Sequence, residues 1–217
     1  MTDFCKDEGL QNPENLLTLL RSFRDPIQQL VATGKAVQFS DIGFTKERLI
    51  IDDFVFNMGN IRRVIIDARK VRGASYAPYS NFNVGAAILT PNTIVRGCNV
   101  ENSSYRATSC AENTATVKAV SDGERKFNLI GIVGGFDHSI DPNIRETAAQ
   151  EFIFPCGCCR QVLYEFGGKN LGIVLAKDND EIFFSLLNYL LPGPFGPESM
   201  GIDASEYSRH NPPKVKA

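Results

Sequence analysis

The sequence predicts an α/β protein in which helices cover a layered sheet. Between residues 60 and 185, segments with hydrophobic residues at helical spacing alternate with short apolar strands. Glycine and proline residues separate these segments, as expected where helices end and the chain turns. Such alternation is typical of α/β folds. With 217 residues, 43% of them hydrophobic, the chain can bury the core of one domain with an appendage.

The first 59 residues are predicted to form an amino-terminal extension that is mainly helical. A run of large apolar residues indicates a helix, and Pro26 interrupts it before the apolar pattern resumes at Ile27. The run consists of Leu16, Leu17, Leu19, Leu20 and Phe23. A second apolar segment, 45–56, is compatible with either a helix or a strand.

The main domain is predicted to span 60–197, with a carboxy-terminal tail at 198–217. Its first helix begins near Ile61, where apolar residues recur every three or four positions, and ends at Gly73. The remaining elements, in chain order, are strands over 84–90 and 93–100, a helix over 110–120, a strand over 129–136, a helix over 156–166, and strands over 171–176 and 182–185.

The charge of the chain argues against a nucleic-acid-binding surface. The formal net charge is -2 and the pI about 5.8, whereas phosphate backbones are bound by clustered Lys and Arg. No apolar run approaches the ~20 residues needed to cross a bilayer. The acidic, polar amino terminus does not fit a secretory signal, so a cytoplasmic location is expected. There, the six cysteines are expected to be thiols or metal ligands rather than disulfides.

Two cysteine motifs indicate a catalytic zinc site. Glu112 stands two residues after Cys110, and Pro155-Cys156-Gly157-Cys158-Cys159 follows further along the chain. Catalytic zinc sites keep three protein ligands and a water, whereas structural sites close the tetrahedron with four protein ligands. Three thiols with a carboxylate beside them therefore favour hydrolytic chemistry. Both motifs begin predicted helices, where free backbone N–H groups and the helix dipole favour thiolate over thiol.

Two other interpretations of the cysteines stay open from these spacings. Cys156 and Cys159 form a Cys-x-x-Cys pair of the kind found in disulfide oxidoreductases, although this leaves the first motif without a role. In a structural zinc site, Cys158 or Cys98 would supply the fourth ligand.

Six motifs follow one another in a fixed order between residues 76 and 197. They are Tyr76-Ala77-Pro78-Tyr79-Ser80-Asn81-Phe82, Val84-Gly85-Ala86-Ala87, Gly97-Cys98-Asn99-Val100-Glu101-Asn102 with Tyr105, Cys110-Ala111-Glu112, Pro155-Cys156-Gly157-Cys158-Cys159-Arg160-Gln161-Val162-Leu163, and Leu190-Leu191-Pro192 with Phe195-Gly196-Pro197. Together they resemble the cytidine deaminases of pyrimidine nucleoside salvage. The resemblance covers about residues 60 to 197 and implies a three-layer α/β/α sandwich of the small, homotetrameric type with three cysteine ligands.

The resemblance implies a role for each residue of the metal site. Cys110, Cys156 and Cys159 hold one Zn²⁺ per subunit, and Glu112 carries protons. The implied reaction is the hydrolytic deamination of cytidine and 2′-deoxycytidine at C4 of the cytosine ring, with release of ammonia. Zinc lowers the pKa of a bound water towards ~7, so that a nucleophile exists at neutral pH.

The resemblance also implies the contacts to the nucleoside. Asn99 and Glu101 become hydrogen-bond partners of the 3′-hydroxyl, and Phe82 packs against the nucleoside. Ala111 and Tyr105 are substrate contacts as well. Taken without the resemblance, Phe82 is compatible with an ordinary core position, Asn99 with a cap or bridge at the end of its strand, and Glu101 with a solvated loop charge.

Phe195 suggests how subunits are arranged. In the small tetrameric members of the family, a carboxy-terminal phenylalanine of a neighbouring subunit covers the base. Phe195 and the short tail fit this type, so the resemblance implies a homotetramer with shared active sites and a small nucleoside as the partner. The local alternative for Phe195 is a hydrophobic contact after Pro194.

Three features depart from the family pattern. Asn113 stands where members with three cysteine ligands usually carry an arginine that hydrogen-bonds the thiolates. The negative charge must then be balanced by helix amides, the Asn113 amide, Arg106 or Arg160, and we expect a more electron-rich zinc ion with a higher water pKa. The stretch 137–151 is longer than usual and is expected to be a solvated loop, with a polar flap near the site as the alternative. The extension lies outside the resemblance.

Three further functions stay open at this point. The first is deamination of a modified or antibiotic cytosine nucleoside, for which Asn99 and Glu101 are less suited than for a plain ribose. The second is an editing deaminase acting on single-stranded nucleic acid, which the acidic pI disfavours. The third is a zinc-stabilised nucleoside-binding protein without turnover, in which Glu112 has no purpose. The sequence does not rank cytidine against deoxycytidine.

Overall fold

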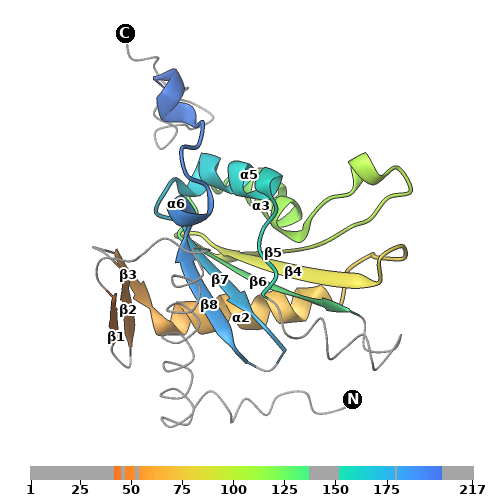
Figure 1. The fold of residues 1–217 in the computed structure, drawn as a ribbon, viewed down its shortest axis with the longest axis horizontal. Helices are drawn as coiled ribbons and strands as arrows, with labels where there is room; N and C mark the ends of the chain where they lie inside the picture. Colours follow the sequence, from red (N-terminus) through yellow and green to blue (C-terminus); the bar gives the residue numbers. More distant parts are fainter. Residues whose placement is uncertain (1–41, 45–46, 52–53, 137–151, 179, 202–217) are drawn as a thin grey trace.

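A five-stranded sheet between two layers of helices forms the centre of the protein (Figure 1). The computed structural model describes residues 42–44, 47–51, 54–136, 152–178 and 180–201. The sheet has the order β5-β4-β6-β7-β8. Its strands are β4 (Phe82–Leu89), β5 (Ile94–Cys98), β6 (Leu129–Phe136), β7 (Gly172–Ala176) and β8 (Ile182–Leu186). Helices on both faces confirm the predicted α/β/α sandwich.

The sheet is mixed. β4 pairs antiparallel with β5 and with β6, where Phe82 lies opposite Phe136 and Leu89 opposite Leu129. β6 and β7 are parallel, so the chain must cross over between them, and α5 lies in that connection. β8 then pairs antiparallel with β7. The crossover brings the start of α5 beside the start of α3.

Helix α2 (Met58–Arg72) covers one face of the sheet, and α3 (Ala111–Ser121) and α5 (Gly157–Gly167) cover the other (Figure 1). Four of the five residues in the predicted apolar stripe of α2 are buried, with exposures of 0 to 2%: Ile61, Val64, Ile65 and Ala68. The fifth, Val71 in the last turn, is half-buried. Short turns complete the fold: η1 (Tyr105–Ala107), α6 (Leu187–Leu190) and η2 (Pro197–Met200). None of the helices in the described ranges is long and apolar enough to cross a bilayer.

The described end of the predicted extension is a sheet and not a helix. β1 (Ile42–Phe44), β2 (Arg48–Ile51) and β3 (Phe54–Asn57) form a three-stranded antiparallel sheet. In β2, Leu49 and Ile51 are buried while Arg48 is exposed, and this alternation of period two is that of a strand packed on a core. The segment 45–56, whose type was open, is therefore extended where it is described.

Three of the predicted segments lie outside the described residues. They are the helix of the first 31 residues, the long stretch 137–151, and most of the tail beyond residue 201. The other predicted helices and strands, from residue 60 to residue 185, are all present, and their ends lie within about three residues of the predicted ones.

Candidate metal centre and nucleoside site

The three predicted zinc ligands meet at the amino-terminal ends of two neighbouring helices. Cys110 is the N-cap residue of α3, Cys156 is the N-cap residue of α5, and Cys159 follows in the first turn of α5. Their sulfur atoms lie within 4.8 Å of one another. Sulfurs about 2.3 Å from a tetrahedral zinc ion are separated by about 3.8 Å, so small side-chain rotations bring these three onto one ion. The donor set therefore fits Zn²⁺.

The proton balance of the thiols suits a cation between them. A hydrogen bond from the Cys159 thiol lowers the pKa of Cys110 to about 6, against the opposing effect of burial. The same contact raises the pKa of Cys159. The backbone N–H of Cys159 donates a hydrogen bond to the Cys156 sulfur at 3.4 Å. The sulfurs of Cys110 and Cys159 thus share one proton, and a metal ion bound between them would replace the positive charge of that proton.

One helix amide, and none of the expected side chains, has a described hydrogen bond to a ligand sulfur. The Asn113 amide nitrogen donates to Ser109 Oγ at 3.3 Å. Arg160 donates to two main-chain carbonyls, each at 2.7 Å. Arg106 is exposed on η1. Among the described residues, the candidate for charge balance that reaches a ligand sulfur is the backbone N–H of Cys159, in the first turn of α5, which donates to the Cys156 sulfur.

A fourth protein ligand is not provided by the two cysteines that were considered for it. Of the described residues, the group able to hold a metal consists of Cys110, Cys156 and Cys159. Cys158 is exposed, and the Cys98 thiol donates to a backbone carbonyl at 3.4 Å. This arrangement agrees with an open zinc site and not with a closed structural one.

Glu112 lies in the first turn of α3, one residue beyond the N1 position, and is only 5% exposed. Burial raises the pKa of its carboxyl to about 7, and the charge of the neighbouring Cys110 adds to this effect. A carboxyl with a pKa near neutrality can both accept and donate a proton at physiological pH. Glu112 therefore has the protonation behaviour that a proton shuttle needs.

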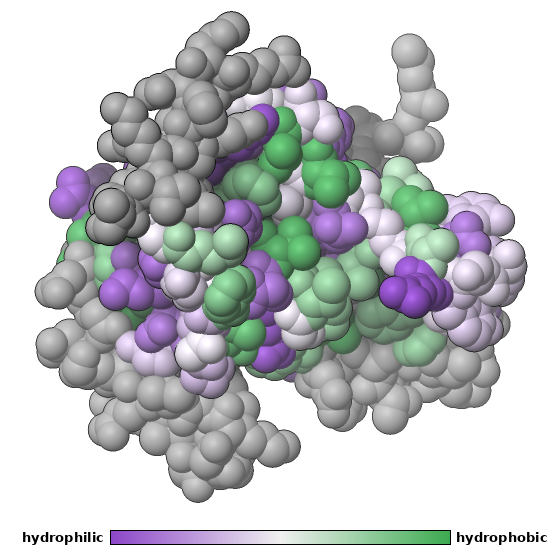
Figure 2. Space-filling model, turned by 90° about the horizontal axis from the view of Figure 1, so that it is seen from above, coloured by the Kyte–Doolittle hydropathy of each residue, from purple (hydrophilic) through white to green (hydrophobic). Residues whose placement is uncertain are grey.

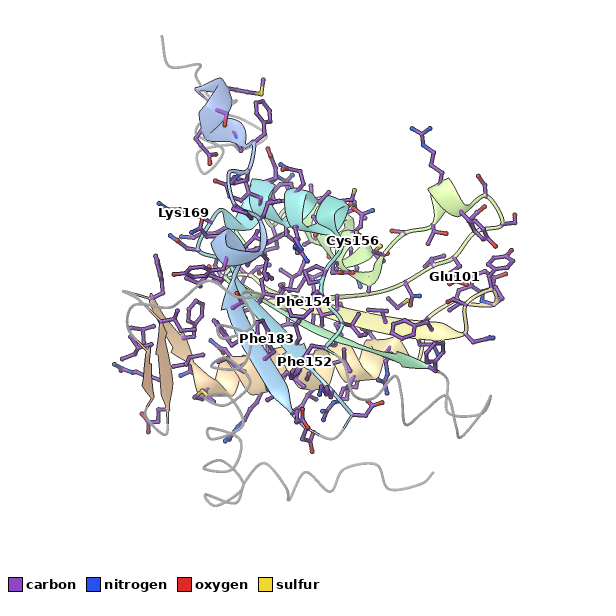
Figure 3. All side chains as sticks on the ribbon, in the orientation of Figure 1. Glu101, Phe152, Phe154, Cys156, Lys169 and Phe183 are labelled. Atoms are coloured by element: carbon purple, nitrogen blue, oxygen red, sulfur yellow. The ribbon has the colours of Figure 1, made fainter. Side chains whose placement is uncertain are left out.

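The segment before Cys156 is held by aromatic contacts. The rings of Phe152 and Phe154 pack against Phe183 of β8, with centroids 5.7 and 5.1 Å apart (Figure 3). The Lys177 ammonium lies over the Phe152 ring, 4.6 Å from its centroid. These contacts place the chain that carries Cys156 against the edge of the sheet.

Asn99 continues the β4–β5 ladder with its side chain. β5 ends at Cys98, and the Asn99 amide then accepts from the Val84 N–H at 2.8 Å and donates to the Phe82 carbonyl at 2.9 Å. The side chain is 9% exposed. A primary amide has two N–H donors, and the described contacts use one of them. Asn99 is therefore a structural bridge with one donor left over.

Glu101 closes the loop that precedes β4. Its carboxylate accepts from the backbone N–H groups of Tyr79 and Ser80, at 2.9 and 3.2 Å, and from the Ser80 hydroxyl. The Ser80 hydrogen bond, followed by the two backbone N–H groups, lowers the pKa of Glu101, so that it stays ionised. Ser80 had no predicted role. A serine followed by an asparagine, here Asn81 with φ of 56°, is a turn signal that points to such a contact.

The other predicted substrate contacts are distributed around this loop and α3. Phe82 packs edge-to-face on Phe136, with centroids 5.0 Å apart. Tyr105, on η1, is 78% exposed, and its ring lies 6.3 Å from that of Tyr79. Ala111 is fully buried at the start of α3.

Phe195 stands apart from this group. Its side chain is 65% exposed, and its carbonyl accepts from the Gln161 side chain on α5 at 2.6 Å. The chain that leads into η2 extends beyond α5, at the top of the view and on the far side from α2 (Figure 1). Phe195 is thus fastened to the outside of its own subunit.

A cavity of about 560 Å³ lies at the other end of α5. Its lining includes residues of β3 and the start of α2, Lys126 in the loop before β6, and Gly167 at the end of α5. An eleven-residue helix is about 16 Å long, and Cys156 is at its opposite end. This cavity is therefore separate from the cysteine cluster.

Comparison with known proteins agrees with the geometry. Residues 58–175 match the family described as the cytidine and deoxycytidylate deaminase zinc-binding region. The chain is 37% identical over 148 residues to a cytidine deaminase of Sporosarcina psychrophila, covering 68% of this chain and 99% of the relative. It is 39% identical over 154 residues to a probable cytidine deaminase of Dictyostelium discoideum, covering 70% and 95%.

A solved structure shows the same fold. The cytidine deaminase from Burkholderia pseudomallei aligns with a TM-score of 0.54 at 38% identity, over 62% of this chain and 98% of that one. The matched region contains both cysteine motifs, Glu112 and the loop of Glu101. With three thiols converging beside a buried carboxyl inside it, the chain belongs to the cytidine and deoxycytidylate deaminase family.

Proposed function

We propose that this protein catalyses the zinc-dependent hydrolytic deamination of cytidine and 2′-deoxycytidine to uridine and 2′-deoxyuridine. The reaction adds one water to C4 of the cytosine ring and releases the amino group as ammonia. The observation that carries the proposal is the cluster of three cysteine sulfurs within 4.8 Å, next to a buried glutamate, in the family domain. A site of this kind serves hydrolysis and not redox chemistry.

Within this proposal, Cys110, Cys156 and Cys159 hold one zinc ion per subunit, which supplies an acidified water as the nucleophile. Glu112 takes a proton from the attacking water and delivers protons to N3 of the ring and to the leaving amino group. Its raised pKa, about 7, allows both directions of transfer from one position. Ala111, at the start of the same helix, packs beside the base.

The free hydrogen-bonding capacity of two residues suits a sugar hydroxyl. Asn99 keeps one N–H donor, and Glu101, with three of about four lone-pair sites in use, keeps one acceptor. A hydroxyl group both accepts and donates, so one 3′-hydroxyl can accept a hydrogen bond from Asn99 and donate one to Glu101. Phe82, whose main chain is bound to Asn99, packs against the nucleoside, and Tyr105 borders the site. A nucleoside without this hydroxyl leaves a charged acceptor unpaired, which weakens binding.

We further propose a homotetramer in which Phe195 of one subunit covers the base bound by another. Large apolar side chains are exposed on the side of the molecule that carries α3, α5 and η1, where hydrophobic residues gather near the middle of the surface (Figure 2). They include Tyr105, Val117, Phe154, Phe195 and Met200. Burial against a second copy removes these groups from water. Phe195 points away from its own subunit's core, as a residue shared with a neighbour would.

The proposed organisation is a catalytic domain at 60–197, an amino-terminal extension at 1–59 and a carboxy-terminal tail at 198–217, in a cytoplasmic enzyme. The match to the family over 58–175 and the absence of a spanning helix in the described residues support this organisation. The acidic pI of about 5.8 supports a free nucleoside rather than nucleic acid as the substrate.

Incubating the purified, zinc-loaded chain with cytidine and with deoxycytidine tests the function. Loss of cytosine absorbance with one ammonia released per nucleoside is expected. Turnover of an antibiotic or modified cytosine nucleoside in place of both would favour the alternative substrate class. Binding of cytidine without ammonia release would identify a zinc-stabilised binding protein. Either result contradicts the proposal.

A further inference from the structure

Ser80 joins three of the groups assigned to the nucleoside. Its hydroxyl donates to Glu101 Oε1 and accepts from the Phe82 backbone N–H at 3.0 Å. The Phe82 carbonyl, in turn, accepts from Asn99 at 2.9 Å. One hydroxyl therefore links the carboxylate to the main chain of the aromatic residue, and that main chain to the amide.

The turn around Ser80 fixes the direction of this hydroxyl. The Asn81 N–H donates to the Ala77 carbonyl at 3.0 Å, which closes the loop. Asn81 then adopts a φ of 56°, a left-handed conformation that asparagine tolerates better than most residues. This reversal places the Ser80 side chain between the Phe82 N–H and the carboxylate of Glu101.

The link determines which lone pair Glu101 can offer. The two backbone N–H donors both bind Oε2, so the Ser80 hydroxyl is the one described contact on Oε1. Without it, Oε1 would be held only through Oε2, and the carboxylate could rotate away from the donor left on Asn99. A binding site for one hydroxyl needs both partners in fixed positions.

We propose that Ser80 is a positioning residue for recognition of the 3′-hydroxyl. It fixes the positions of the free lone pair of Glu101 and of the Phe82 backbone relative to the free N–H of Asn99. Ser80 acts through these residues and does not itself contact the nucleoside. The inference rests on the proposed function, because it needs a ribose at Glu101.

The test compares cytidine with 3′-deoxycytidine, using zinc-loaded full-length protein. For wild type, removal of the 3′-hydroxyl should lower kcat/KM at least about tenfold. Ser80→Ala should lower kcat/KM for cytidine about tenfold, mainly through KM, and should change the value for 3′-deoxycytidine less than about twofold. Ser80→Thr, which keeps the hydroxyl, should restore discrimination to within about threefold of wild type.

Ser75→Ala is the matched control. This variant also removes one serine hydroxyl from the loop before β4, but the half-buried Ser75 hydroxyl donates to the Val84 carbonyl at 3.1 Å and not to Glu101. This variant should keep the wild-type ratio between the two nucleosides. If Ser75→Ala matched the selective loss of Ser80→Ala, the effect would belong to the loop as a structure, and the positioning role would be wrong.

The remaining outcomes separate this proposal from the function on which it rests. An equal loss for both nucleosides in Ser80→Ala, or no loss, overturns the positioning role while leaving the deaminase proposal intact. Wild-type protein that accepts both nucleosides equally well contradicts the role of Asn99 and Glu101, and with it that of Ser80. Absence of cytidine turnover in wild type overturns the proposed function itself.

Discussion

Gly97 of β5 lies in direct contact with the backbone of Ala111, the first residue of α3. A Cβ atom on Gly97 would come within 2.7 Å of the Ala111 carbonyl oxygen and would also overlap the backbone of Ala115. Real Cβ atoms are not found that close to a backbone oxygen. The absence of a side chain at Gly97 therefore sets how closely the helix that carries Cys110 and Glu112 approaches the sheet.

Gly97→Ala should move the start of α3 and loosen the zinc site. Overpacking of this kind costs about 1–3 kcal/mol of unfolding free energy. Chemical denaturation and zinc content after dialysis measure the two effects. Gly73→Ala is the control, because its Cβ would lie 3.7 Å from the Lys70 carbonyl oxygen, an ordinary van der Waals distance. If both variants kept the same stability and zinc content, the close packing would have no bearing on the metal centre.

Glu112→Gln should retain zinc and lose turnover by a factor of at least about 10² to 10⁴, because the amide cannot carry protons. Cys110→Ala should lose both zinc and turnover. Cys158→Ala is the matched cysteine control and should keep both, since Cys158 is exposed and lies outside the metal cluster. Metal analysis beside the cytidine assay distinguishes the three. Zinc loss in Cys158→Ala, or activity in Glu112→Gln, contradicts the assigned roles.

Two defective subunits should complement each other if Phe195 acts in a neighbour's site. Phe195→Ala chains keep Glu112, and Glu112→Gln chains keep Phe195, so mixed oligomers contain some complete sites. After exchange of subunits, the mixture should exceed the summed activities of the two variants. Mixing Glu112→Gln with Cys110→Ala is the control without a gain, because each variant lacks a catalytic group or metal ligand of its own subunit and no site in the mixture is complete. A wild-type chain that remains a monomer in light scattering would refute the shared site.

The Tyr164 hydroxyl donates to the Glu198 carboxylate, which fastens η2 to α5. This hydrogen bond, with burial and the carboxylate charge adding to it, raises the pKa of Tyr164 to about 12. A raised pKa means that the stabilisation is complete below the ordinary tyrosine pKa of about 10 and is lost as the pH rises to about 12.

Glu198→Gln should therefore lower the pKa of Tyr164 towards about 10, because the negative charge is gone. Absorbance of the tyrosinate form, followed during a pH titration, measures the change. Tyr164→Phe identifies which transition belongs to this residue. Identical titration curves for Glu198→Gln and wild type would show that the carboxylate does not hold Tyr164.

The sequence predicted the main domain well because its signals are local. β6 was predicted with the ends it has, Leu129 and Phe136, because a short apolar run is bounded by polar residues. The three-stranded sheet at 42–57 could not be recognised in the same way. Its strands have three or four residues, too few for an alternation of buried and exposed residues to be recognised in the sequence. Leu49 is buried by packing in the same hydrophobic core as the apolar face of α2, a contact that the local sequence does not show.

At the site, the sequence predicted which residues take part but not the hydrogen bonds that they make within the folded chain. The cysteine spacing was enough to predict the metal cluster, since two helix starts supply all three sulfurs. It could not show that Asn113 binds Ser109, or that Glu101 is occupied by the loop of Ser80. Which lone pair of a carboxylate is taken depends on contacts between segments twenty residues apart, and these follow from the folded backbone.

Asn57 ends β3 and also caps α2, accepting the Asn60 N–H on its side chain at 3.2 Å. Beside it, Phe56 packs on Phe184 of β8, with ring centroids 4.8 Å apart. The match to the family begins at residue 58, in the middle of these contacts. The small sheet and the catalytic domain should consequently unfold as one cooperative unit, and a chain cut where the family begins would lose its first helix cap together with part of its core.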